Sequence, residues 1–188
     1  MYYAPWMYSY PASPYMSMPM CNCMGQLNYG MTMNGTYPFG FDSSTMERSH
    51  MELKDYGPNP FVINIHEATE QNNTYRTALW TGKHLQVTLM SLQPGEDIGL
   101  EIHPQLDQFI RIEQGQGITQ MGKTREQLKF VRTVQDDDAI IIPAGTWHNL
   151  TNTGNIPLKL YSIYAPLQHP FGTVHVTKED AMRADRHH

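Results

Sequence analysis

The stretch from residue 95 to residue 115, GEDIGLEIHPQLDQFIRIEQG, carries the first of two patterns that decide the fold. The residues before and at His103 form a short apolar run that predicts a strand. In a strand, residues two apart point to the same face, so Glu101 and His103 are expected to lie side by side. Gln108 opens the next predicted strand after a short turn.

The second pattern lies in residues 137–152, DDAIIIPAGTWHNLTN. His148 follows the tight turn Pro143-Ala144-Gly145 and begins another predicted strand. A strand that offers Glu101 and His103 on one face, met by a distant histidine from a second strand, is typical of a metal site. Two histidines and one carboxylate on one face of an ion suit Fe(II) and related divalent ions.

The sequence around these patterns predicts an all-β domain. Short runs of β-branched and aromatic residues alternate with turn residues such as Pro94-Gly95, at the spacing of a sandwich or closed barrel. A short helix is expected near the end, where Thr177 can cap it with Asp180 three residues on. The predicted strands are Phe61–Ile65, Leu85–Leu92, Gly99–His103, Gln108–Glu113, Gly117–Met121, Leu128–Thr133, Ala139–Ile142, Trp147–Thr151, Leu158–Tyr164 and Thr173–Val176.

Both stretches resemble the paired signatures of the cupin superfamily. The first family signature is Gly, five residues, His-x-His, three or four residues, Glu, six residues and Gly. Here Gly95, Glu101-Ile102-His103, Gln108 and Gly115 stand at these places. The family's first histidine is therefore replaced by glutamate, and its glutamate by glutamine.

The second family signature is Gly, five residues, Pro-x-Gly, two residues, His, three residues and Asn. Asp137 takes the place of its opening glycine, and Pro143-Ala144-Gly145, His148 and Asn152 match the rest. Asp tolerates the backbone geometries of turns, so the replacement at this position is compatible with the family's turn. All the spacings of both signatures match.

The resemblance implies a double-stranded β-helix, or jelly-roll barrel, with a divalent metal ion inside. The implied ligands are Glu101, His103, Gln108 and His148. A typical metal-binding cupin offers three histidines and one glutamate, a total charge of −1. This set also carries −1, because the carboxylate has moved from the third position to the first. A barrel of the same family that has lost its metal is the alternative.

Oxygen ligands beside two imidazoles favour Mn(II) or Fe(II), with Zn, Ni and Co open by their general order of affinity. Expected wall residues are Gln86, Thr88 and Met90 on one strand, and either Tyr161 and Ile163 or Leu160 and Tyr164 on another. The basic residues Arg76, Lys83 and Arg111 are not tied to the site by spacing, and His169 and His175 are expected to be structural or exposed.

The N-terminal part of the chain differs sharply in composition from the rest. Residues 1–41 hold no Asp, Glu, Lys or Arg, yet they contain most of the methionines and tyrosines and both cysteines, Cys21 and Cys23. We predict a Met/Tyr/Pro-rich low-complexity tail at 1–41, a linker at 42–60, the cupin barrel at 61–176, and a short helix and chain end at 177–188. The tail is either disordered or an assembly arm.

Composition also limits the partners. A formal net charge of −5 argues against a protein that mainly binds nucleic acid, and no apolar run is long enough to span a membrane. Two functions stay open: a metal-dependent enzyme of isomerase or dioxygenase type acting on a small molecule, and a self-assembling structural protein. A homo-oligomer, at least a dimer, is implied by the resemblance. Cytoplasmic synthesis is expected, and the tail composition resembles that of spore coat proteins.

Overall fold

The computed structural model describes residues 51–186, except the side chain of residue 185. The predicted tail and residues 42–50 of the predicted linker lie outside these residues. The strands are β1 Arg76–Thr81, β2 Gln86–Leu92, β3 Asp107–Gln114, β4 Gln116–Gly122, β5 Phe130–Gln135, β6 Ala139–Ile142, β7 Trp147–Asn152, β8 Leu158–Ala165 and β9 Val174–His175, and the helices are α1 Ile65–Gln71 and α2 Lys178–Asp185.

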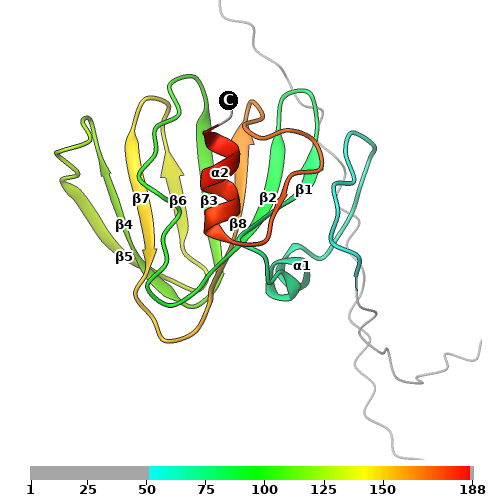
Figure 1. The fold of residues 1–188 in the computed structure, drawn as a ribbon, viewed down its shortest axis with the longest axis horizontal. Helices are drawn as coiled ribbons and strands as arrows, with labels where there is room; N and C mark the ends of the chain where they lie inside the picture. The colour runs from blue at the N-terminus through cyan, green and yellow to red at the C-terminus, as the bar shows by residue number, and fades with distance from the viewer. Residues whose placement is uncertain (1–50, 187–188) are drawn as a thin grey trace, which may run out of the picture. The chain divides into compact units, whose positions relative to one another are not determined.

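The strands form two antiparallel sheets, as the predicted jelly-roll fold requires. One sheet has the order β6-β3-β8-β2-β1-β9, and the other has the order β5-β4-β7. Figure 1 shows β4, β5 and β7 at one side of the domain and β1, β2 and β8 at the other. Neighbours such as β3 and β8 are far apart in sequence, so residues from distant parts of the chain meet on the inner faces.

The core lies between the two sheets. Every second residue of β7 is buried, as are Ile140 and Ile142 of β6, which places one face of each strand inside. Ile110 and Ile112 of β3 pack in the same core cluster. No helix among the described residues is long and apolar enough to cross a membrane.

Most of the predicted strands are confirmed, and the errors have local causes. Residues 61–65 were expected to be a strand, but Asn64 caps α1 by accepting a hydrogen bond from the backbone of Glu67 (3.3 Å). β1 was missed because both of its faces are buried, so its sequence shows no alternation. The predicted helix at the end is confirmed, with a capping box between Thr177 and Asp180.

The described residues before the barrel, 51–60, lie against β1 within the segment expected to be a linker. The backbone N–H of Tyr56 donates to the carbonyl of Leu79 (2.9 Å). The carboxylate of Asp55 accepts bonds from the backbone and hydroxyl of Thr81 (2.9 and 2.6 Å) and from the backbone of Gly172 (2.9 Å). One side chain thus fastens both this segment and the loop after β8 to β1.

Lys159 of β8 is a buried cation that fixes the end of α1. Its ammonium group donates to the backbone carbonyls of Glu70 and Asn72 and to the side chain of Asn73 (3.0 Å). Burial lowers the pKa of Lys159. The carbonyls at a helix C-terminus lack partners within the helix and carry a partial negative charge, so this contact supplies both hydrogen bonds and charge.

Asp137 takes the turn geometry that the family's glycine would take. Its φ is 70°, and among the described residues it is the one residue other than glycine with positive φ. Its carboxylate pairs with Arg111 of β3, and its backbone N–H donates to the carbonyl of Ile112 (3.0 Å). The expectation that aspartate is accommodated at this turn is confirmed.

We predict opposite effects for two substitutions at this turn. Asp137→Gly removes the left-handed strain and loses only an exposed ion pair, so its melting temperature should equal or exceed that of the parent. Asp137→Val should lower the free energy of unfolding by about 1–2 kcal/mol, because a β-branched side chain opposes positive φ. Asp136→Val, at an exposed neighbour, is the matched control for urea denaturation. A valine variant at position 137 as stable as this control would contradict the argument.

Candidate metal centre

Backbone pairing places Glu101 directly opposite His148. The N–H of Glu101 donates to the carbonyl of His148 (3.0 Å), and the N–H of His148 donates to the carbonyl of Glu101 (2.9 Å). Residues that exchange both bonds in an antiparallel pair stand side by side. The segment predicted as a strand at Gly99–His103 is thus an isolated bridge at Glu101 rather than a regular strand, because Gly99 has a φ of 89°.

The turn before β7 is attached to the segment that carries His103. The backbone N–H of Gly145 donates to the carbonyl of His103 (2.8 Å). The N–H of Ala144 donates to the carboxylate of Asp107 (2.8 Å) at the start of β3. The two signature stretches are therefore held together by backbone hydrogen bonds and by the carboxylate of Asp107, independently of the side chains that could bind a metal.

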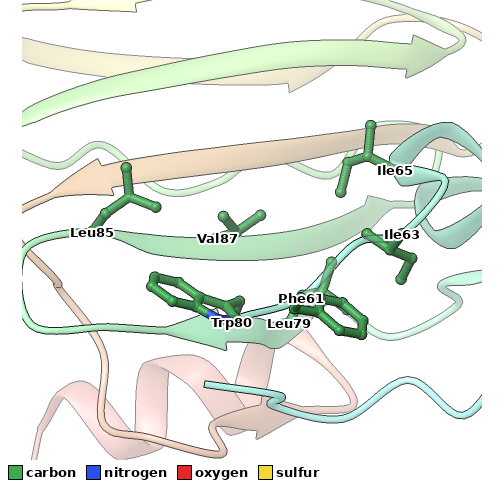
Figure 2. A pocket seen from close by; sticks show the side chains of 7 residues that line it. All are labelled: Phe61, Ile63, Ile65, Leu79, Trp80, Leu85 and Val87. Carbon is green, nitrogen blue, oxygen red and sulfur yellow. The ribbon is translucent and has the colours of Figure 1, made fainter. Parts of the chain in front are cut away.

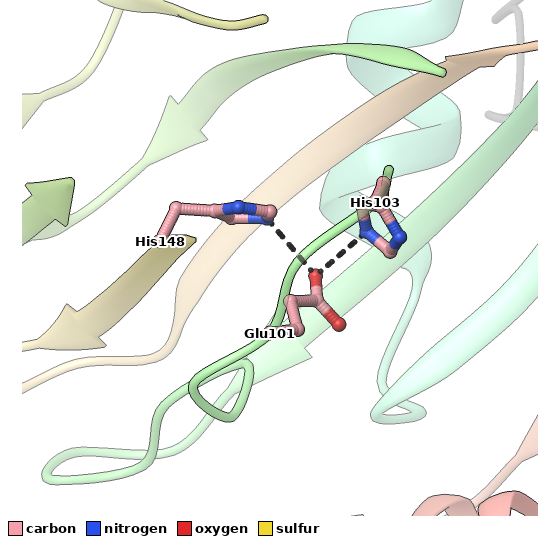
Figure 3. Close-up of side chains that lie close together, drawn as sticks. All are labelled: Glu101, His103 and His148. Carbon is pink, nitrogen blue, oxygen red and sulfur yellow. Dashed lines mark ion pairs between the residues drawn. The ribbon is translucent and has the colours of Figure 1, made fainter. Parts of the chain in front are cut away.

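The side chains of Glu101, His103 and His148 converge (Figure 3). Oε1 of Glu101 lies 3.3 Å from Nε2 of each histidine, and one ligand atom from each residue lies within 4.8 Å of the other two. The exposed fraction is 7% for His103 and 1% for His148, against 25% for the side chain of Glu101. The predicted meeting of these three residues is confirmed.

The distances among these atoms fit a shared cation. Ligand atoms at about 2.1 Å from one ion are about 3.0 Å apart when their bonds meet at right angles and about 3.4 Å apart at the tetrahedral angle. The observed 3.3 Å lies in this range. Oε1 of Glu101 and both Nε2 atoms are buried without a hydrogen-bond partner. Burying such atoms is costly, and a bound cation would remove the cost.

The protonation states of the triad also suit metal binding. Nδ1 of His148 lies 2.9 Å from the carbonyl oxygen of Thr146, which can only accept, so Nδ1 carries a proton and Nε2 is the nitrogen that could bind an ion. Burial raises the pKa of Glu101, but the two imidazoles, together with Arg76, outweigh burial and hold the pKa at about 2. The carboxylate is therefore ionised. Thr146 contacts a predicted ligand rather than the ion itself, and the sequence did not identify it.

Gln108 is buried in the same interior. Its Nε2 donates to Oγ of Ser162 (2.9 Å), while its Oε1 has no hydrogen-bond partner. Gln108 pairs across strands with Tyr164, whose ring meets the ring of His103 edge-on, with centroids 5.7 Å apart. The amide nitrogen is thus occupied and the amide oxygen remains available. Its role as a fourth ligand stays a prediction.

The inner wall includes the expected residues of β2 and one of the two alternatives on β8. Gln86 and Thr88 are fully buried, as is Met90. On β8 the buried face carries Leu160 and Tyr164, whereas Tyr161 and Ile163 are only partly buried. The alternation of the sequence left this choice open, and the packing of Tyr164 on His103 decides it.

His169 belongs to the wall, although sequence reasoning expected a structural or surface residue. Its backbone N–H and carbonyl both bond to the side-chain amide of Gln86 (2.9 Å each). Its ring meets the ring of Tyr164 edge-on, with centroids 5.2 Å apart. Burial, aided by the charge of Arg76, lowers the pKa of His169 to about 3, so the imidazole is neutral. Nothing in its local sequence marks this contact.

Two hollows lie beside the triad. His103 lines one of about 300 Å³ together with Leu106 and Pro166. Glu101 lines another of about 220 Å³, together with Arg76 and residues of α2. A third hollow, of about 320 Å³, is lined by side chains without titratable groups and offers no ligand for a metal (Figure 2): Phe61, Ile63, Ile65, Leu79, Trp80, Leu85 and Val87.

Comparisons with known proteins agree with this geometry. A family model described as a cupin domain matches residues 88–164. The uncharacterized protein YrkC of Bacillus subtilis (strain 168) is 58% identical over 191 residues, which cover 95% of this chain and 100% of that protein. The uncharacterized protein L612 of Acanthamoeba polyphaga mimivirus is 47% identical over 119 residues, 63% of this chain and 72% of that protein.

A solved structure also matches. The crystal structure of BH2720 from Bacillus halodurans shares 66% identity with a TM-score of 0.69, and the match covers 69% of this chain and 98% of that chain. The two signature stretches, the pair of antiparallel sheets and these matches lead to one conclusion. The chain belongs to the cupin family, and Glu101, His103 and His148 form a candidate metal-binding triad within it.

Proposed function

We propose that this cupin holds a divalent metal ion on Glu101, His103, Gln108 and His148, and acts there on a small molecule. The observation that carries the proposal is the position of one carboxylate oxygen, 3.3 Å from two imidazole nitrogens, with all three atoms buried and without hydrogen bonds. An arrangement of this kind is costly unless a cation occupies it.

The ligand set favours Mn(II) or Fe(II). Two imidazoles and one carboxylate on one side of an ion leave positions open on the other, as in Fe(II) sites that bind substrate or O₂. The amide oxygen of Gln108 adds a hard ligand, which suits Mn(II) equally. Zn, Ni and Co are the other candidates, because the general order of affinity favours them over Mn(II) and Fe(II).

A divalent ion supplies Lewis acidity toward a carbonyl or hydroxyl group, which serves isomerase-type and dioxygenase-type reactions. Residues of the chain keep the predicted metal ligands in a state that can bind the ion. Glu101 stays ionised, and the carbonyl of Thr146 fixes the tautomer of His148. Tyr164 and Thr88, both buried, keep water from the inner side.

Removal of a ligand should abolish metal binding. We expect His148→Ala to retain no stoichiometric Mn(II) in elemental analysis after gel filtration. This loss is larger than the roughly 10–100-fold loss of affinity that follows removal of a residue bonded to a ligand.

Gln108→Glu should bind Mn(II) more tightly than the parent, because it adds a second carboxylate, and Ser162 can donate its hydroxyl proton to it. Gln108→Met, of similar shape, should bind more weakly.

His66→Ala is the matched control, because His66 is an exposed histidine whose Nδ1 lies 2.8 Å from Oε2 of Glu113 and is not part of the triad. It should keep the parent's metal content. Stoichiometric metal in His148→Ala would refute the ligand assignment. Equal affinity of the parent, Gln108→Glu and Gln108→Met would exclude Gln108 as a ligand and leave the triad alone.

We propose assembly as a second function, because the uncharged first 41 residues concentrate Met and Tyr side chains, which bury area on many surfaces. In this proposal the barrel forms a homo-oligomer, at least a dimer, after cytoplasmic synthesis, and the tail joins it into a larger particle such as a spore layer. Both functions can coexist in one protein.

Deletion of residues 1–41 tests the assembly proposal. We expect the shortened chain to keep the melting temperature and metal content of the parent, but to form smaller particles in light scattering after gel filtration. A second variant keeps residues 1–41 but has their tyrosines replaced by serine, which separates the effect of the aromatic side chains from the effect of tail length. It should also form smaller particles. An unchanged particle size in both proteins would contradict a role of the tail in assembly.

A further inference from the structure

We propose that the small molecule taken by the metal centre is an anion, and that Arg76 binds its carboxylate. This inference rests on the proposed function and names the chemical class of its ligand. Arg76 lies on β1, and spacing in the sequence gave no reason to connect it with the site. The structure brings it into the hollow of about 220 Å³ that Glu101 also lines.

Arg76 is almost fully buried, with an exposed fraction of 3%. Its guanidinium carbon lies 5.6 Å from the ring centroid of Tyr75, which also lines the hollow. A buried arginine is a costly feature in a small barrel and is usually tied to a specific partner. Arg76 also interacts with its protein surroundings, so a ligand would join or exchange those contacts rather than fill a void.

The charge of Arg76 reaches the groups around the metal centre. It helps to lower the pKa of Glu101, by less than the two imidazoles do. It also adds to the effect of burial in lowering the pKa of His169, and it opposes the burial that raises the pKa of Tyr164.

The charge balance of the site calls for an anion. The predicted ligand set supplies one negative charge, from Glu101, against two positive charges of the ion. Arg76 adds a further positive charge beside the same hollow. Lys178 of α2, at the edge of this hollow, is already paired with Asp97 (2.6 Å). A metal-loaded interior is therefore net positive, and a low-dielectric site of this kind attracts a carboxylate more than a neutral group.

The shape of the hollow limits the anion. Its volume of about 220 Å³ lies below the range of about 300–1,000 Å³ for drug-sized ligands. The remaining lining is mainly apolar and includes Ile98, Leu100, Ala181 and Met182. Such a hollow suits a short carboxylic acid, with its carboxylate on Arg76 and its other end toward Glu101, the predicted ligand that lines the hollow. A guanidinium can hold a carboxylate through two parallel hydrogen bonds.

Calorimetric titration of the Mn(II)-loaded full-length protein tests this inference, with malonate as the probe and malonamide as its neutral analogue. The wild type should prefer malonate by more than free Mn(II) does in the same buffer. Arg76→Gln should weaken malonate binding by about tenfold or more and leave malonamide binding unchanged, since the charge-assisted hydrogen bonds from the guanidinium to the carboxylate are lost. Arg111→Gln, at a partly buried arginine on β3 that does not line this hollow, should change neither.

Arg76→Lys keeps the positive charge but loses the paired N–H donors of the guanidinium, so its affinity for malonate should be intermediate. This variant supplies a test if Arg76→Gln does not fold. Equal malonate affinity in wild type and Arg76 variants that retain Mn(II) would overturn the inference and leave the metal site intact. Parallel loss of malonate and malonamide would also overturn it, because it would indicate general damage. A wild type that holds none of Mn(II), Fe(II), Zn(II), Ni(II) and Co(II) would overturn both this inference and the proposed function.

Discussion

The pair of backbone hydrogen bonds between Glu101 and His148 is the contact on which the rest of the site depends. It joins two stretches that lie far apart in the sequence and fixes their register, because a shift by one residue would turn every side chain to the other face. The bond from Gly145 to the carbonyl of His103 then sets the third member of the triad. The site is thus built by the backbone, and it would form in this register without the metal.

The interior that results is unusually polar for a small barrel. The inner atoms of the triad and the amide oxygen of Gln108 are buried without hydrogen bonds, and Arg76 is buried close by. Isolated polar groups of this kind are destabilising, so the anchors elsewhere must offset them. Lys159 on the end of α1 and Asp55 on β1 are two such anchors. The barrel therefore combines buried polar atoms that lower its stability with hydrogen bonds at its edges that raise it.

Much of this could be predicted from the sequence, for reasons that particular residues make clear. The spacing of Glu101, His103 and His148 predicted their meeting, because turn residues fix where each strand begins. The contacts of Arg76 and His169 could not be predicted, since each reaches the interior through pairing of elements that leaves no local signature. β1 was missed because a strand buried on both faces shows no alternation. Composition could suggest a role for residues 1–41 but no structure.

The most direct test of the central claim is an anomalous-scattering map from crystals of the full-length protein grown with Mn(II), collected on both sides of the manganese absorption edge. The account predicts one strong peak in the barrel, within bonding distance of Oε1 of Glu101 and Nε2 of His103 and His148. The same map would show whether Gln108 contributes its oxygen. Crystals in which these three side chains keep their places but enclose no peak, while manganese binds elsewhere, would contradict the account.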